Sequence, residues 1–482
     1  MLTGVNLLLR LVSTSFQVYI SGRIGAAGVG LLQLVLSVGM LAMTAGMAGI
    51  RTTSMYLTAE ELGRKKPGTV RWVLSGCFLY SIICSGVVAV GLYCFAPQIA
   101  SSWIGDIRTA GAIRLFAAFL PVSCLCGVMV GYFTAANRIG TLAAVEVAEQ
   151  LLSMLITIYA LAFWAGSDPA KACQCVVLGS GIGACITLLS LCLLRLKERI
   201  TTEKRIPVRS RLLQMAIPLA LADDLKAGIN TIENLMVPKR LALYPGVQDP
   251  LGSFGAVCGM VFPVLMFPAA ILFGLAELLI PELARCAAAG SQNRIQYLVK
   301  RSLRVAMLYG CVLTALMYLL SQPLCLALYG NADAGAWLKR FSLLIPMLYC
   351  DAITDAMTKG LGQQKACVRY NILTSVLDVV FLYLLLPKYG MQGYFLSFLV
   401  THLLNFILSL GRLLKITKIR LQMTSPLLCG LAAAASVWVC SFLSAPVLQG
   451  VVCVLIMGCL MFLLGVLRKE DILWLKGLVY KK

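Results

Sequence analysis

Apolar stretches of about 20 residues, each long enough to cross a bilayer as a helix, follow one another along the whole chain. The composition agrees, because 60% of the 482 residues are hydrophobic and only 13% are charged, about half the charged fraction of a soluble protein. A transmembrane β-barrel would show strands that alternate apolar and polar residues, and no such alternation is visible. The sequence therefore predicts an all-α polytopic membrane protein.

We expect about 14 transmembrane helices. The expected spans are 2–21, 29–57, 72–96, 110–134, 140–165, 173–195, 212–237, 254–280, 303–328, 340–361, 367–387, 391–414, 424–444 and 448–467. Sidedness follows from the basic residues: with a cytoplasmic N-terminus, Lys and Arg are roughly three times as frequent in the cytoplasmic loops as in the outer ones. Both termini are therefore expected in the cytoplasm, with the chain in a bacterial plasma membrane.

The two halves of the chain resemble each other. Pro121 of the fourth span has a counterpart in Pro346 of the tenth, and Glu149 of the fifth has a near counterpart in Asp378 of the eleventh. Transporters built from two parallel six-helix repeats bind their substrate between the halves. We expect two six-helix pseudo-repeats and an appended C-terminal pair. The domains would be an N-terminal lobe 1–195, a cytoplasmic linker 196–211, a C-terminal lobe 212–414, and the helix pair with a cytoplasmic tail 415–482.

Composition excludes several other classes. The formal net charge is +21, but the positive charge of cytoplasmic loops accounts for it, so we expect no nucleic-acid binding. The 19 cysteines form no CxxC pair, and the chain has a single histidine, His402, so no metal site and no cofactor are expected. No GxxxxGK[ST] loop for ATP is present. The energy for any transport would then come from an ion gradient, the membrane potential or substrate supply.

The seventh span, 212–237, is apolar but unusually charged. A charged side chain in the middle of a bilayer costs roughly 2.5–3.5 kcal/mol even on the lenient insertion scale. Helical periodicity places Asp223, Lys226, Asn230 and Glu233 within one stripe, while Asp224 points elsewhere. Such a stripe must face something wet or charged inside the bundle. It indicates a polar pathway through the membrane.

Basic and amide residues within spans are the candidates for substrate binding: Arg10, Gln17, Arg51, Lys226 and Asn230. A cationic cavity suits an anionic group such as a phosphate, pyrophosphate or carboxylate. The alternative is neutralisation, in which Lys226 pairs with an acid on its own helix and Arg10 snorkels to the cytoplasmic edge.

Acids within the spans are the candidates for coupling to Na⁺ or H⁺. They are Asp223, Glu233, Glu149, Asp351, Asp355 and Asp378. Carboxylates in this setting bind Na⁺ or carry a proton. For each acid taken singly, the alternative is a hydrogen bond between helices.

Several stretches carry a resemblance to a known family. They are 21–31 (SGRIGAAGVGL) with 48–50 and 59–61; 131–133 with 137 and 149–150; and 217–218 with 233 and 237–241, continued by 386–394 (LPKYGMQGY). They resemble the stage V sporulation protein B group of the multidrug/oligosaccharidyl-lipid/polysaccharide (MOP) flippase superfamily, which includes lipid II flippases and MATE transporters. The similarity extends over nearly the whole chain.

The resemblance implies a flippase that moves a lipid-linked oligosaccharide by alternating access. The substrate would be a precursor of cell wall, spore cortex or polysaccharide, and membrane lipids would be the other partner. In related lipid II flippases, arginines of the central cavity meet the pyrophosphate, and Arg10 and Arg51 occupy similar places. Two departures are visible: Gln17 stands where relatives often have a second arginine, and Arg51 replaces the usual proline after Gly49–Ile50.

Two other functions stay open at this stage. A cation-coupled multidrug or metabolite antiporter of the same fold would use an essential carboxylate, for which Asp223, Asp355 and Asp378 are available. A polytopic membrane transferase is the other alternative, but short loops and a lone histidine argue against it. We therefore expect a transporter, not an enzyme, that works as a monomer.

Overall fold

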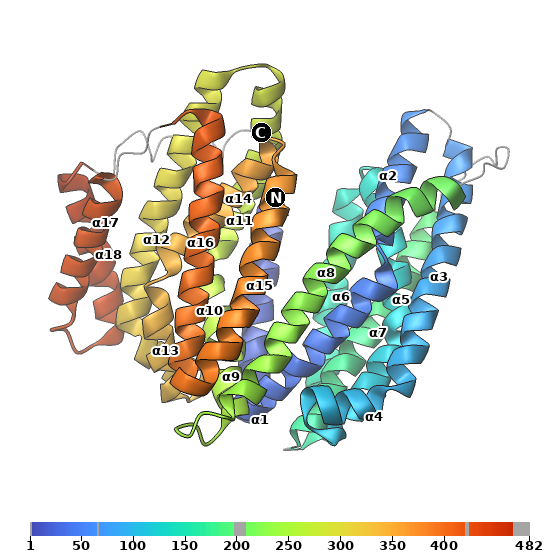
Figure 1. Ribbon diagram of the computed structural model, residues 1–482, viewed down its shortest axis with the longest axis horizontal. Helices are drawn as coiled ribbons and strands as arrows, with labels where there is room; N and C mark the ends of the chain where they lie inside the picture. Colours follow the sequence, from blue (N-terminus) through green and yellow to red (C-terminus); the bar gives the residue numbers. More distant parts are fainter. Residues whose placement is uncertain (1, 65–66, 167, 197–208, 420–423, 466–482) are drawn as a thin grey trace. The chain divides into compact units, whose positions relative to one another are not determined.

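The computed structural model describes residues 2–64, 67–166, 168–196, 209–419 and 424–465, and every long element among them is an α-helix (Figure 1). The all-α expectation is confirmed. Nine of the described helices, or ten if one bent pair counts as a single span, are long and apolar enough to cross a membrane. The expected total of fourteen stays a prediction. Most of the linker 196–211 and the tail after 465 lie outside the described residues.

The chain divides into two compact units, which are residues 23–239 and residues 1–22 with 240–482. The backbone passes between the units twice, within α1 (Leu2–Met47) and within α8 (Arg209–Leu241). Gly25, with φ of 69°, interrupts the helical geometry of α1 just after residue 22, where one unit ends and the other begins. The lobe boundaries at 195 and 212 came from an internal repeat and not from contacts, so they stay a prediction.

The unit 23–239 is built around α5. Its further helices are α2 (Ile50–Gly63), α3 (Val70–Cys94), α5 (Ala110–Ala135), α6 (Ile139–Ala160) and α7 (Pro169–Leu196), with the short α4 (Ala96–Gln98) between α3 and α5. Helix α5 packs against α2, α3 and α7, and α6 packs against α7. Leu57, Met129 and Phe133 lie in the apolar core where α2, α3 and α5 meet. Leu212 and Ala216 of α8 belong to the same core, so α2 and α8 are both packed on it.

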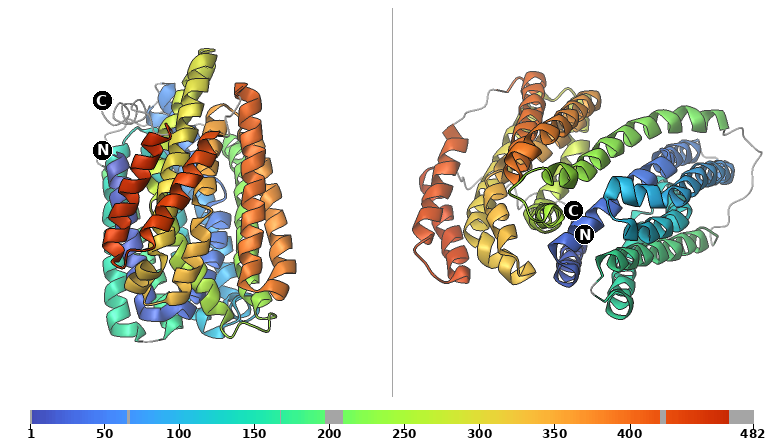
Figure 2. Two further views of the ribbon diagram at one scale, coloured as in Figure 1. Left: turned by 90° about the vertical axis from the view of Figure 1, so that its left-hand side faces the viewer. Right: turned by 60° about the horizontal axis from the view of Figure 1, so that its bottom comes forward.

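The other unit is built around α12 and α14. Its helices are α9 (Pro250–Gly255), α10 (Phe262–Met266), α11 (Ala269–Ala288), α12 (Gln292–Tyr329), α13 (Ala332–Ser342), α14 (Ile345–Gly360), α15 (Gln364–Tyr389), α16 (Met391–Thr417), α17 (Thr424–Cys440) and α18 (Pro446–Leu463). Helix α14 packs against α11, α12 and α16, and α15 lies along α16. The pair α17–α18 packs on α12 (Figures 1 and 2), where Cys311, Cys429 and Met457 are buried together.

One span of this second unit is broken. The segments Pro250–Met266 and Ala269–Ala288 meet at an angle of 60°. Pro268 has no N–H to donate at the break. Two tyrosines hydrogen-bond to backbone carbonyls there: Tyr349 donates to the carbonyl of Leu265 at 3.0 Å, and Tyr309 donates to that of Pro268 at 2.9 Å. Non-helical backbone at membrane depth needs such partners, because no water supplies them.

Candidate functional site

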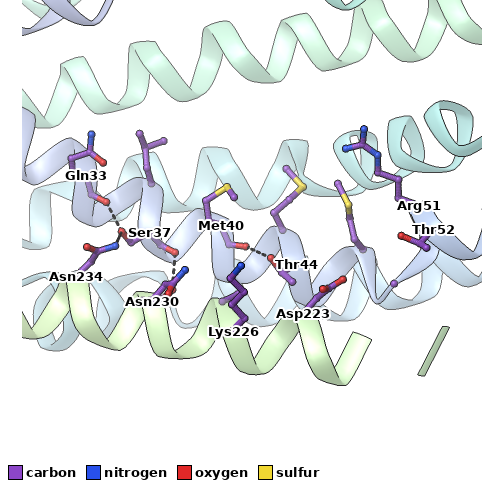
Figure 3. A pocket seen from close by; sticks show the side chains of 16 residues that line it. Gln33, Ser37, Met40, Thr44, Arg51, Thr52, Asp223, Lys226, Asn230 and Asn234 are labelled. Carbon is purple, nitrogen blue, oxygen red and sulfur yellow. Dashed lines mark hydrogen bonds between the residues drawn. The ribbon is translucent and has the colours of Figure 1, made fainter. Parts of the chain in front are cut away.

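A pocket of about 550 Å³ with both apolar and charged lining residues lies within the unit 23–239. The second half of α1, the start of α2 and the middle of α8 form its walls (Figure 3). Pockets of this size are typical of sites that enclose a small ligand or a headgroup. The charged stripe of the seventh span, α8, contributes three of its four members to this pocket.

Helical periodicity brings the lining side chains onto one face of each helix. Among the polar and sulfur-containing residues that line the pocket, one set on each helix is regularly spaced: Gln33, Ser37, Met40 and Thr44 on α1 and Asp223, Lys226, Asn230 and Asn234 on α8. Successive members are three or four positions apart on both helices, so each set forms a single stripe. The two stripes run in opposite directions along the pocket (Figure 3).

Hydrogen bonds attach α8 to α1 at one end of the pocket. Thr231 donates its hydroxyl to the carbonyl of Ser37 at 3.1 Å, and the amide of Asn234 donates to the Ser37 hydroxyl at 3.0 Å. At the N-terminal end of α8, Arg211 bonds to Glu60 and Glu61 of α2. Helix α8 is thus held near both ends, and its middle turns face the pocket.

The interruption of the helix between α1 and α2 sets the position of Arg51. Ala48 and Gly49 adopt positive φ values of 44° and 70°, which end α1 and start α2. A Cβ atom on Gly49 would lie 2.7 Å from the carbonyl oxygen of Ala216, so only glycine allows α8 to approach this closely. Arg51 follows at the second residue of α2 and is exposed to the pocket.

The pocket carries more positive than negative charge. Arg51 and Lys226 supply two cations, and Asp223 supplies a single carboxylate. Lys226 is exposed, and within the described part of the chain it forms no ion pair with Asp223 or Glu233. Glu233 itself is not a lining residue. The ammonium of Lys226 and the guanidinium of Arg51 are therefore available to an anion.

Arg10 and Gln17 belong to the other compact unit. The guanidinium of Arg10 lies 5.3 Å from the ring centroid of Phe273, a cation–π contact. The amide of Gln17 donates to the carbonyl of Gly259 at 3.2 Å, in the same broken span as Phe273. Both residues are half-buried, and they contact this span of their own unit.

Two of the candidate acids share a second cavity, of about 210 Å³, in that same unit. Asp351 and Asp355 line it together with Asn371, His402 and Asn405. The amide of Asn405 donates to the Asp351 carboxylate at 3.1 Å. Asp355 forms an ion pair with Lys359 at 2.5 Å. Asp355 is therefore already neutralised, whereas Asp351 has a neutral partner.

The remaining acids are separate from these cavities. Asp378 is buried and accepts hydrogen bonds from Ser397 at 2.5 Å and Thr401 at 3.1 Å, which join α15 to α16. Glu149 lines a cavity of about 220 Å³ in the unit 23–239, between α5, α6 and α7, beside Phe116 and Phe119. The acids thus lie in several different environments.

Sequence reasoning missed the α1 wall of the pocket. Gln33, Ser37 and Thr44 lie in the second span but carry no charge, so they did not stand out among the apolar residues. Their spacing of four and seven positions is a polar stripe that a search for periodicity in uncharged residues would have found. Asn234 completes the stripe of α8 by the same rule.

Comparison with known proteins gives a consistent result. Residues 57–466 match the family model described as "Lipid II flippase MurJ". The chain is 20% identical over 461 residues to "Stage V sporulation protein B" of Bacillus subtilis (strain 168), a match that covers 93% of this chain and 88% of the relative.

Solved structures show the same fold. A lipid II flippase MurJ in an inward closed conformation superposes with a TM-score of 0.72 at 11% identity and covers 98% of this chain and 99% of the other. An inward-facing MATE family multidrug resistance transporter of the MOP superfamily has a TM-score of 0.67 at 15% identity, covering 86% of this chain and 100% of the other. At these identities the matches establish the fold alone.

Proposed function

Because the chain belongs to the lipid II flippase MurJ family, we propose that it moves a lipid-linked oligosaccharide from one leaflet of the membrane to the other. Such a substrate joins a long polyprenyl chain to a saccharide through a diphosphate. The hydrocarbon chain can stay in the bilayer throughout, so the protein must shelter only the polar headgroup. The substrate would be a precursor of cell wall, spore cortex or polysaccharide.

The observation that carries this proposal is the excess of positive charge in the pocket, where two cations face a single carboxylate. Arg51 offers a planar fork of N–H donors, which matches phosphate oxygens, and Lys226 offers a compact charge across the pocket. Each charge-assisted hydrogen bond contributes about 1.5–3 kcal/mol. A diphosphate between the two side chains would exchange its hydration for these bonds. Arg10 stays a proposed substrate-binding residue of its own unit.

Asp223 gives the same pocket a means of coupling. Its carboxylate lines the charged part of the pocket and would repel a diphosphate while ionised. Uptake of a proton or Na⁺ at Asp223 would remove the repulsion, so cation binding and headgroup binding would favour each other. Asp351, with its neutral partner Asn405, is the corresponding candidate in the other unit. An ion gradient would then drive transport. The substrate would cross the membrane without any of its covalent bonds being formed or broken.

The rival function is a cation-coupled multidrug or metabolite antiporter. Two observations favour this function: the superposition with a MATE transporter and the presence of Asp351 and Asp355 in one cavity. A cationic drug would, however, be repelled by Arg51 and Lys226. We propose further that the protein acts as a monomer in the plasma membrane with both termini in the cytoplasm, as the distribution of basic residues indicates.

The test is flipping of lipid II in proteoliposomes, measured by the accessibility of its headgroup to a membrane-impermeant reagent. Arg51→Ala and Lys226→Ala should each lower the flipping rate about tenfold to a hundredfold, since each removes a charge-assisted bond. Arg114→Ala is the matched control, because Arg114 is an exposed cation of the same unit that packs over Tyr93 outside the pocket. Wild-type rates in both pocket variants, at normal protein levels, would refute the cationic pocket.

A further inference from the structure

The pocket described above separates its charges from its neutral polar groups. Arg51 and Asp223 lie toward one end, and Lys226 lies near the middle of the pocket (Figure 3). The opposite end carries three side-chain amides, which are Gln33 on α1 and Asn230 and Asn234 on α8. A diphosphate would use the charged end only. The amide end needs a different partner.

The amides are free to bind one. The backbone carbonyl of Gln33 accepts the Ser37 hydroxyl at 2.8 Å, but the side-chain amides of Gln33 and Asn230 make no hydrogen bond with any other described residue. Asn230 is also exposed. Asn234 uses its N–H₂ group on Ser37 and keeps its carbonyl oxygen. A side-chain amide offers both donors and an acceptor without net charge. Groups of this kind suit hydroxyls and acetamido groups, and they add nothing to the binding of an anion by charge.

The length of the pocket matches a headgroup larger than a diphosphate. Lys226 and Asn234 are eight residues apart on one helix, which places them about 12 Å apart along its axis at 1.5 Å per residue. Two linked phosphates bound at Lys226 cannot reach Asn234. A group attached to the diphosphate and enclosed by the same pocket would extend along Asn230 toward Gln33 and Asn234.

From this arrangement we infer that Gln33 and Asn230 recognise the first sugar of the substrate, while Arg51 and Lys226 hold its diphosphate. The inference rests on the proposed function and adds a specificity site to it. The ligand of the amide end is a sugar ring that carries hydroxyl and acetamido groups, directly linked to the diphosphate. The chain then selects a glycosylated polyprenyl diphosphate over the same lipid without sugar.

The experiment compares two lipids on the purified full-length protein in nanodiscs. One is a polyprenyl diphosphate without sugar, and the other is the same lipid carrying a disaccharide with N-acetylated sugars. Gln33→Ala and Asn230→Ala should each weaken binding of the sugar-bearing lipid about tenfold, equal to about 1.4 kcal/mol. Binding of the lipid without sugar should change less than about twofold, because these substitutions leave Arg51 and Lys226 in place.

Two controls separate this inference from the function on which it rests. Gln98→Ala removes an exposed side-chain amide of the same unit that does not line the pocket, and it should change neither affinity. Arg51→Ala should weaken both lipids by the same factor. Equal losses for both lipids in the Gln33 and Asn230 variants, or no loss for either, would overturn the sugar site while leaving the flippase proposal standing. Unchanged binding of both lipids in Arg51→Ala would instead reject the diphosphate site.

Discussion

Glu61 is the residue whose charge should contribute most to holding α8 against α2. Its side chain is only 3% exposed, although it is a carboxylate at the end of a helix. It accepts a hydrogen bond from the Thr69 hydroxyl at 2.8 Å and one from the Arg211 guanidinium at 3.0 Å, and Arg64 lies 3.6 Å away. Glu60, the preceding residue, also pairs with Arg211 and Arg64, but its side chain is 42% exposed. The two glutamates thus share partners and differ in burial.

We predict that Glu61→Gln lowers the free energy of unfolding by about 2 kcal/mol. The substitution keeps the volume and turns charge-assisted bonds of about 1.5–3 kcal/mol into neutral ones of about 0.5–1.5 kcal/mol, and it leaves Arg211 partly uncompensated. Glu60→Gln, the matched control, should cost at most about 0.5 kcal/mol, because water screens an exposed pair. With about 2–4 °C per kcal/mol for a domain of this size, Tm should fall by about 4–8 °C against about 1–2 °C.

The assay is thermal unfolding of the detergent-purified protein at low and high salt. The loss in Glu61→Gln should persist at high salt because the carboxylate is buried, whereas any loss in Glu60→Gln should vanish. In an Arg211→Gln background the Glu61 substitution should cost clearly less, since the two residues form one interaction. Equal Tm shifts for the two glutamate variants would refute the argument that burial decides the strength of this contact.

Three further predictions test other parts of the structure. Gly131→Ala should destabilise the protein by about 1–3 kcal/mol, because its Cβ would lie 2.5 Å from a backbone carbonyl oxygen of α2. The control Gly86→Ala, where nothing lies within 4 Å of the new Cβ, should be neutral or stabilising. Equal Tm values for these two variants would contradict the prediction. Tyr349→Phe should lower stability by about 1–3 kcal/mol, since it removes the bond to Leu265 at the broken span; an unchanged Tm would show that this carbonyl finds another donor. Arg10→Ala should abolish lipid II flipping at unchanged protein levels in the leaflet-accessibility assay, and a normal rate would remove Arg10 from the substrate path.

Much of the fold follows from the sequence because a bilayer allows few solutions. Backbone groups in hydrocarbon must be satisfied within the segment, so a long apolar run is a helix. The exception shows the limit of the rule. The broken span at Pro268 looks like a continuous span in the sequence, because the groups that support its break, Tyr309 and Tyr349, are distant in the chain.

The candidate site could be predicted on one of its walls. The charged residues of α8 stood out because charge in an apolar helix is costly, and their spacing put Lys226 and Asn230 on one face. The α1 wall carries amides and hydroxyls, which cost far less to bury and leave a weaker signal. The acids have different partners, and the sequence did not predict which. Asp378 accepts a hydrogen bond from Ser397 of α16, and Asp355 forms an ion pair with Lys359. The charge of an acid alone does not identify such a partner.

The sequence by itself thus determined the class of the protein, most of its helices and the polar face of α8. Helical periodicity decides which residues share a face, and it depends only on local geometry. Which helix that face meets was decided by the tertiary structure. The bare backbone at Gly49 lets α8 approach α2, and the hydrogen bonds to Ser37 hold α8 on α1, so Lys226 and Arg51 line one pocket. Such contacts join residues far apart in the chain, and their fit exists only once the helices are packed.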